Sequence, residues 1–111
     1  MDKSDIVSGF LLELRRGTVV LCVLTMLKEP TYGYNLISRL SDTGIAIEGN
    51  TLYPLLRRLE EQGLLESIWN TDGAKPRKYY STTAFGSEVL TELKRHWDTV
   101  SQSMTKLLEE K

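Results

Sequence analysis

The sequence is poor in the residues on which most catalytic and metal sites depend. Among its 111 residues there is one cysteine, Cys22, and one histidine, His96. A lone cysteine excludes a disulfide within the chain, and no cysteine and histidine cluster has the spacing of a zinc site. No glycine-rich phosphate loop and no convincing Ser-His-Asp set is present. We therefore expect no enzyme activity, metal or cofactor, and we expect Cys22 to be a small buried residue in a reducing cytoplasm.

Long hydrophobic runs and a large excess of one charge are also absent. No apolar run reaches the roughly 18 residues that a membrane span needs, and the N-terminal segment lacks the organisation of a secretory signal. The 14 lysines and arginines nearly balance the 15 aspartates and glutamates, which gives a net charge of −1. Because this balance does not favour nucleic acid, a DNA-binding function has to depend on a local basic patch.

The apolar residues are spaced as in a series of helices. One apolar helix face predicts a helix over Ser4–Arg15. Gly17 separates it from Thr18–Lys28, which is apolar nearly all round and is expected at the centre of the core. A further helix is predicted over Tyr32–Leu40. Gly33 lowers its helix propensity, which indicates either close helix packing or a later start.

Another helix and a hairpin follow. Asn50 is predicted to cap a helix over Thr51–Gln62, which carries a leucine stripe and ends at Gly63, a residue suited to a left-handed stop. Beyond it the pattern changes to two aromatic or β-branched runs, Leu64–Asn70 and Arg77–Thr83, joined by a turn-forming segment. These runs predict a two-stranded hairpin with a partly basic tip.

A long helix completes the chain, predicted from Ala84 to about Glu110 with Thr83 as its cap. The three helices over residues 18–28, 32–40 and 51–62, followed by a two-stranded hairpin, are typical of a winged helix-turn-helix, so the fold class is mainly α. Since two isolated strands are marginal alone, the wing must lie against the helices. We expect a DNA-binding domain over residues 1–83, with its N-terminal helix at 4–15, and a dimerisation helix over residues 84–111.

The predicted fold brings the cations of Thr51–Gln62 and of the hairpin tip to one face. A helix fits the major groove, and lysine and arginine bind phosphates or guanine. The alternative is that Arg57 and Arg58 only pair with Glu60, Glu61 or solvent, and that the basic turn is only soluble surface. Residues 49–83 carry a net charge of only +1 (five basic minus four acidic). The candidate DNA contacts are Thr51, Tyr53, Arg57, Arg58, Lys75, Arg77 and Lys78, with neutral phosphate contacts from Thr31, Tyr32 and Asn35.

The long last helix predicts a second copy of the chain. A helix of about 27 residues spans roughly 40 Å, which is more than a core of this size can cover. Its apolar seam and the exposed row on the first helix are expected to pack in a twofold homodimer, which presents two reading helices to a palindromic site on double-stranded DNA. The candidate interface residues are Ile6, Phe10, Leu14, Val89, Leu93, Trp97, Val100, Met104 and Leu107.

Trp97 lies on this seam and has two interpretations. An indole on a helix seam usually serves interface packing. Alternatively, two Trp97 side chains facing each other across the twofold axis form a platform for a planar aromatic small molecule. Both interpretations stay open at this point.

Three stretches together resemble a known family. They are PTYGYNLISRL (30–40), GNTLYPLLRRLEEQGLLES (49–67) and PRKYYSTTAFG (76–86), and the resemblance is to the short PadR-type bacterial transcriptional regulators. It implies a dimeric winged-helix repressor with a wing that touches DNA. It also places Trp97 where multidrug-sensing members stack planar drugs. Phenolic-acid specificity is not implied, because the second domain of longer members is absent here.

Two other classes of function remain compatible with the sequence. One is a protein-interaction module, in which the basic face is idle and the long helix docks another protein. The other is a small-ligand sensor without any DNA role. A repressor released by a small-molecule effector is the function we expect.

Overall fold

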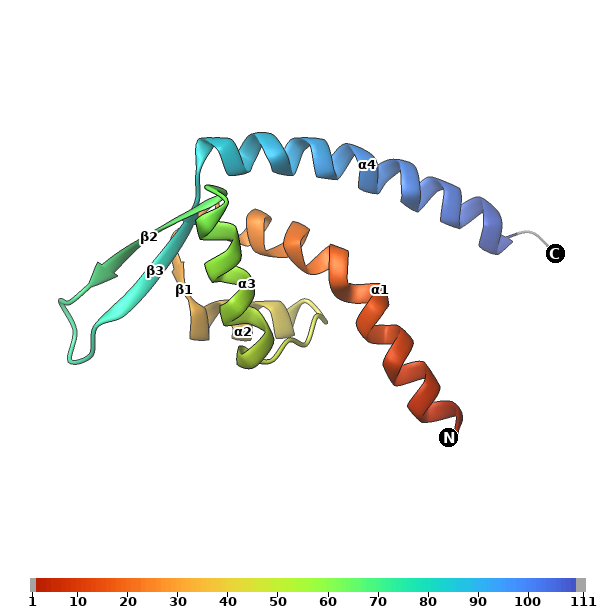
Figure 1. The fold of residues 1–111 in the computed structure, drawn as a ribbon, viewed down its shortest axis with the longest axis horizontal. Coiled ribbons are helices and arrows are strands. Elements are labelled where there is room, and N and C mark those ends of the chain that lie inside the picture. The colour runs from red at the N-terminus through yellow and green to blue at the C-terminus, as the bar shows by residue number, and fades with distance from the viewer. Residues whose placement is uncertain (1, 110–111) are drawn as a thin grey trace.

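The computed structural model describes residues 2–109 and confirms a mainly helical winged-helix fold. The strands form one antiparallel sheet in the order β1-β3-β2, and the β2–β3 hairpin projects from the helices as a wing (Figure 1). No helix in this part of the chain is both long and apolar enough to cross a membrane. The elements in chain order are α1 (Lys3–Met26), β1 (Thr31–Tyr32), α2 (Gly33–Asp42), α3 (Gly49–Glu61), β2 (Leu65–Asn70), β3 (Arg77–Thr82) and α4 (Ala84–Glu109).

The core is built from one face of each of the first three helices. Its innermost leucine and valine residues keep at most 2% of their surface exposed, as expected from the stripe on α3 and from the apolar second half of α1. Cys22 is half-buried beside this core, and burial raises the pKa of its thiol. The innermost side chains are Val23, Leu24, Leu27, Leu36, Leu40, Leu52, Leu56 and Leu59.

The prediction of two N-terminal helices separated at Gly17 is wrong, because α1 runs through this residue as one helix of 24 residues. A glycine inside a helix costs about 1 kcal/mol relative to alanine, which good helix formers on both sides can offset. A Cβ added at Gly17 would meet nothing within 4 Å, so no turn or close contact requires a break there. The helix begins after Asp2, whose carboxylate accepts a hydrogen bond from the Asp5 N–H at 3.0 Å.

Strand β1 adds a third strand that the sequence pattern did not predict. Thr31 pairs with Tyr80, and Tyr32 pairs with Tyr79. Two residues are too few for a period-two pattern to be recognised. As a result α2 begins at Gly33, one residue later than Tyr32.

Other boundaries agree closely with the sequence. Gly63 closes α3 with a φ of +81°, and the Thr83 hydroxyl caps α4 by accepting from the Gly86 N–H at 2.9 Å. Helix α3 starts at Gly49, two residues before the predicted start, so Glu48 replaces Asn50 as its cap residue. The end predicted for α4, Glu110, lies outside the described residues.

The segment Thr82–Gly86, which we call the clasp, ties three elements together. Thr82 donates from its N–H to the Leu27 carbonyl at 2.7 Å and from its hydroxyl to the Leu24 carbonyl at 2.8 Å, both at the end of α1. Thr83 donates from its hydroxyl to the Gly63 carbonyl at 2.7 Å. The clasp therefore fixes where α4 leaves the core relative to α1 and α3.

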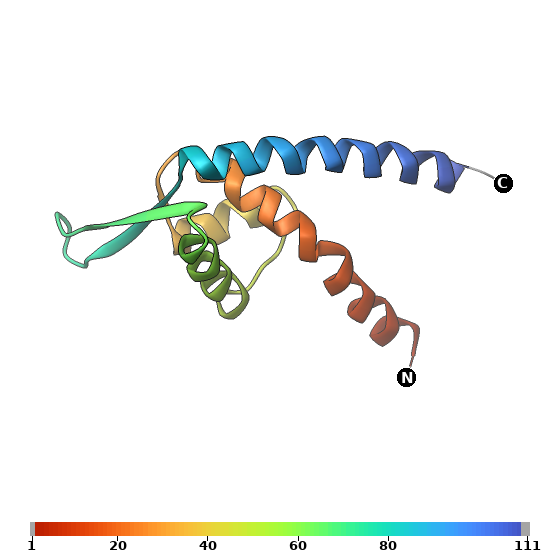
Figure 2. The same cartoon turned by 45° about the horizontal axis from the view of Figure 1, so that its top comes forward.

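Helices α1 and α4 extend well beyond the core. The radius of gyration is 16.3 Å, whereas a compact domain of this length has about 13 Å. Both helices leave the core in the same direction and diverge toward their free ends, on the side opposite the wing (Figures 1 and 2). The fold of one chain therefore leaves two long helix surfaces without a partner.

The substitution Gly86→Ala should destabilise the fold through the clasp. A Cβ at Gly86 would overlap the Leu64 carbonyl oxygen and approach the Thr82 side chain. Such overpacking costs about 2 kcal/mol, which lowers the thermal midpoint by roughly 10 °C in a domain of this size. Gly17→Ala is the matched control, because it meets no atom and should raise stability by up to about 1 kcal/mol. Equal midpoints for the two variants would contradict the contact at the clasp.

Candidate nucleic-acid interface

The candidate interface is formed by α3 and the β2–β3 hairpin. Leu52, Leu56 and Leu59 face the core, which leaves the remaining sides of α3 exposed. The N-terminal end of α3 and the hairpin tip both lie on the side of the molecule away from α4 (Figure 1). One surface thus presents a helix and a projecting loop, and the two long helices leave from elsewhere.

Tyr53 sets the approach of α3 to the start of α2. Its ring lies where a Cβ on Gly33 would be, and it would also come within 3.2 Å of a Cβ on Gly49. Gly33 is buried, so the close packing indicated by its presence in the sequence is confirmed. Tyr53 nevertheless keeps 42% of its residue surface exposed. It is therefore held against two backbones while remaining accessible.

Aromatic and cationic side chains link the hairpin to the start of α2. The rings of Tyr32 and Tyr79 meet edge to face with centroids 5.5 Å apart. The Arg77 guanidinium lies 4.5 Å from the centre of the Tyr32 ring, a cation–π contact that restrains the arginine without consuming its charge. The sequence could not predict this cluster, because the cluster depends on the pairing of β1 with β3.

Lys78 is held by an acidic partner on α3. Its ammonium lies 3.5 Å from the Glu60 carboxylate, which also accepts a hydrogen bond from the Ser67 hydroxyl. Desolvation alone would lower the pKa of Lys78, but Tyr80 and Glu60 outweigh it and raise that pKa above its ordinary value. Lys78 thus stays charged, yet it serves first to fix the hairpin on α3. The pairing with Glu60 that was considered for Arg57 and Arg58 is made by Lys78 instead.

The two arginines of α3 lie in different surroundings. Within residues 2–109, neither Arg57 nor Arg58 has a carboxylate within 4 Å. Arg58 and Thr51 line a groove beside α1, whereas Arg57 lies outside that groove. The surface predicted as one patch therefore has two parts, and the sequence could not separate them without the position of α1.

The remaining predicted contacts differ in accessibility. Lys75 and Arg77 are exposed on the hairpin, and Tyr32 and Asn35 are half-buried at the start of α2. Thr31 is only 3% exposed; its hydroxyl donates to the Glu29 carbonyl at 3.0 Å and accepts from Arg39 at 3.2 Å. Thr31 is therefore not available to a phosphate, and this expectation is corrected.

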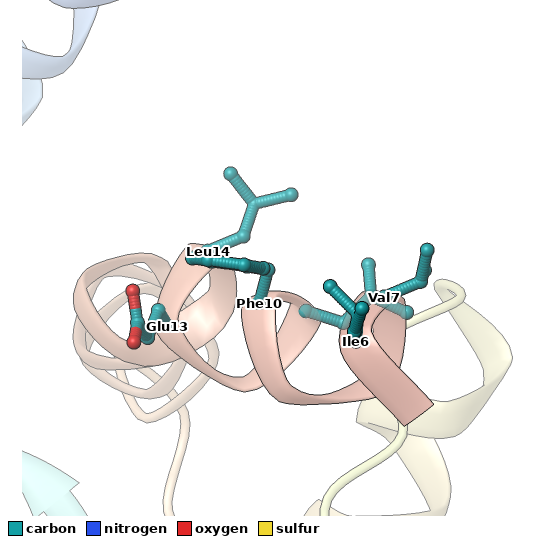
Figure 3. Close-up of a pocket in the computed structure, with 6 residues that line it drawn as sticks. Ile6, Val7, Phe10, Glu13 and Leu14 are labelled. Carbon is teal, nitrogen blue, oxygen red and sulfur yellow. The ribbon is translucent and has the colours of Figure 1, made fainter. Parts of the chain in front are cut away.

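The apolar seam predicted for dimerisation is also divided. Val89 and Leu93 are half-buried against the core of their own chain, so a second copy can cover only the remaining part of these side chains. Helix α1 exposes a row of apolar side chains around a shallow hollow of about 500 Å³, and Ile6, Phe10 and Leu14 project from the same side of the helix (Figure 3). Trp97, Val100, Met104 and Leu107 are 43–62% exposed on α4.

Comparison with known proteins identifies relatives over nearly the whole chain. The sequence profile of the Transcriptional regulator PadR-like family matches residues 20–92, which include all three stretches on which the resemblance was based. The transcriptional regulator Rv3488 of Mycobacterium tuberculosis is 32% identical over 93 residues, covering 83% of this chain and 87% of its own.

Solved structures agree with the fold. A PadR family transcriptional regulator from Eggerthella lenta has a TM-score of 0.89 at 56% identity and covers 97% of this chain and 96% of its own. A PadR-like transcriptional regulator from Bacillus cereus has a TM-score of 0.81 at 31% identity and covers 89% of this chain and 99% of its own. The resemblance inferred from the sequence is confirmed.

Proposed function

Because this chain belongs to the PadR-like family of transcriptional regulators, we propose that it is a homodimeric, sequence-specific DNA-binding repressor released by a small molecule. The observation that carries the DNA-binding part of this proposal is that α3 and the wing lie on the same side of the molecule (Figure 1). Arg57 on α3 and Lys75 and Arg77 on the hairpin are exposed on elements that reach the same side of the molecule. A helix and a loop arranged in this way fit the major groove and the adjoining phosphates.

Each element has a distinct part in this proposal. Tyr53 and Arg57 on α3 meet base edges, where an arginine pairs best with guanine, and Thr51 and Arg58 on the same helix add phosphate contacts. Lys75 and Arg77 meet phosphates, and the cation–π contact with Tyr32 orders the arginine before binding. Tyr32 and Asn35 at the start of α2 add neutral phosphate contacts. Lys78 contributes less to DNA binding, because its ammonium is already paired with the Glu60 carboxylate at 3.5 Å.

Dimerisation is supported by the parts of α1 and α4 that extend beyond the core, which we call the arms. Apolar side chains follow both α1 and α4 beyond the core, and a second copy covers them without any other partner. Twofold pairing is the commonest arrangement of identical subunits, and it places two α3 helices on a palindromic site. The proposed interface comprises Ile6, Phe10, Leu14, Trp97, Val100, Met104 and Leu107.

An effector site at Trp97 completes the proposal. Trp97 is 44% exposed on the face of α4 that the second copy is expected to meet. Two such indoles across the twofold axis would hold a planar aromatic molecule between their faces. A ligand that favours one spacing of the arms then changes the spacing of the two α3 helices and lowers operator affinity.

Arg57→Ala should weaken binding to a duplex from the region upstream of the protein's own gene. Loss of a contact to guanine costs about 10- to 100-fold in affinity, and loss of a contact to phosphate reduces the salt dependence by about one charge. Fluorescence anisotropy at several salt concentrations measures both. Arg95→Ala is the control, because Arg95 pairs with Glu92 on α4. Binding that is independent of salt, or an equal loss in both variants, would contradict the interface.

Leu107→Asp should weaken the dimer without unfolding the chain. Leu107 is 62% exposed in one chain, so a charge there costs little until a second copy covers it. Sedimentation velocity should show at least a tenfold weaker self-association. Ile68→Asp, on the 72% exposed wing position, is the control and should leave the dimer intact. A Leu107→Asp dimer as tight as the wild type rejects α4 as the dimer seam.

Saturable quenching of Trp97 by acridine would test the effector site. The chain has two tryptophans, so Trp69→Phe leaves Trp97 as the only tryptophan, and its emission is excited at a wavelength that tyrosine does not absorb. Acridine should quench this variant with a saturating curve, and Trp97→Leu should weaken acridine binding at least tenfold by calorimetry. Quenching that rises linearly, as with free tryptophan, would leave Trp97 as packing alone.

A further inference from the structure

A groove of about 890 Å³ lies between α1 and α3, and its lining includes neither Trp97 nor any other residue of the proposed dimer interface. One wall comes from the middle of α1, the other from α3, and the loop between α2 and α3 closes one end. Its volume falls in the range of small-molecule sites, roughly 300–1,000 Å³. The DNA-binding proposal uses two residues of its rim and leaves the groove itself without a role.

The polar part of this groove is strongly cationic. Arg15, Arg16 and Arg58 reach it from two helices, and Glu48 is the one acidic residue of the lining. Among residues 2–109, none of the three guanidinium groups lies within 4 Å of a carboxylate. Guanidinium groups remain charged at all physiological pH values and bind carboxylates through paired hydrogen bonds. The charge therefore favours an anionic group between the two helices.

The apolar part of the groove is aliphatic. Val19, Ile47 and Leu55 are buried or half-buried within it, and no aromatic side chain is among its lining residues. A flat aromatic ligand would find no ring on which to stack, whereas a flexible hydrocarbon chain gains from burial against any aliphatic surface. The groove thus differs in chemistry from the Trp97 platform.

We propose that the groove between α1 and α3 binds an aliphatic carboxylate of medium chain length, one per chain. The carboxylate pairs with Arg15 and Arg16 at the α1 wall and with Arg58 opposite. The hydrocarbon chain lies along Val19, Ile47 and Leu55.

This ligand has a consequence for DNA that rests on the proposed function. Arg58 and Thr51 belong both to the groove and to the proposed DNA surface. A bound carboxylate withdraws Arg58 from DNA and bridges α3 to α1, one of the two proposed dimer arms. It should therefore reduce operator affinity.

Calorimetry with decanoate, below its micelle concentration, tests the site without any DNA. Decanoate should bind once per chain, and octanoate more weakly by about fourfold for each methylene removed. Acetate and 1-decanol, which lack the chain or the charge, should bind at least tenfold more weakly. The double variant Arg15→Gln/Arg16→Gln should lose at least tenfold in decanoate affinity, whereas Arg95→Gln on α4 should keep it.

Four results would overturn the site. If decanol binds as tightly as decanoate, the arginines of the groove do not bind the carboxylate. Unchanged affinity in Arg15→Gln/Arg16→Gln, or loss of binding in Trp97→Leu, places the ligand elsewhere. An absence of decanoate binding, with self-association weakened in Arg15→Gln/Arg16→Gln, means that a second copy occupies the groove.

Measurements of DNA binding with and without decanoate distinguish a failure of this proposal from a failure of the proposed function. Decanoate should lower the affinity of the wild-type protein for the upstream duplex at least fivefold and should have little effect on Arg15→Gln/Arg16→Gln. If decanoate binds but does not change DNA affinity, the regulatory link is wrong and the site stands. If the protein binds no DNA at all, the proposed function fails and the calorimetric result is unaffected.

Discussion

The clasp between Thr82 and Gly86 determines how every functional surface is placed. Its backbone and hydroxyl groups bind carbonyls at the end of α1 and just after α3, and Gly86 lies directly against the Leu64 carbonyl. Because β3 enters the clasp and α4 leaves it, the wing, the recognition helix and both arms share one fixed point. In the proposed dimer, a change in the spacing of the arms therefore moves α3 as well, because the hydrogen bonds of the clasp connect α3 to both α1 and α4.

The electrostatic design is local. The whole chain has a net charge of −1, and yet Arg57, Lys75 and Arg77 are exposed without a neutralising carboxylate in residues 2–109. Glu60 offsets Lys78 and attaches the hairpin to α3. Lys78 is therefore less available for a phosphate contact, and its ion pair with Glu60 orders the wing. This ion pair also limits non-specific attraction to DNA, which depends on the number of free cations.

The sequence predicted the elements whose signals are local. The leucine stripe on α3, the stop at Gly63, the hairpin and the Thr83 cap of α4 each depend on a few neighbouring residues, and all are present. The break at Gly17 was wrong because a glycine permits a bend without requiring one. Strand β1 was not predicted because two residues carry no period. The burial of Thr31 and the cluster of Tyr32, Tyr79 and Arg77 depend on this strand, so they were not predicted either. Arg58 lines the groove beside α1 and Arg57 does not. This difference depends on the position of α1, which the pattern of residues within α3 cannot predict.

The central claim is that two α3 helices, paired through the arms, read one duplex from its major groove. Hydroxyl-radical footprinting combined with guanine N7 methylation interference on the upstream duplex measures this directly. The account predicts two protected patches with interfering guanines in the major groove, centred about 10 base pairs apart, which is one turn of DNA. A single protected patch, or interference confined to the minor groove, would contradict it.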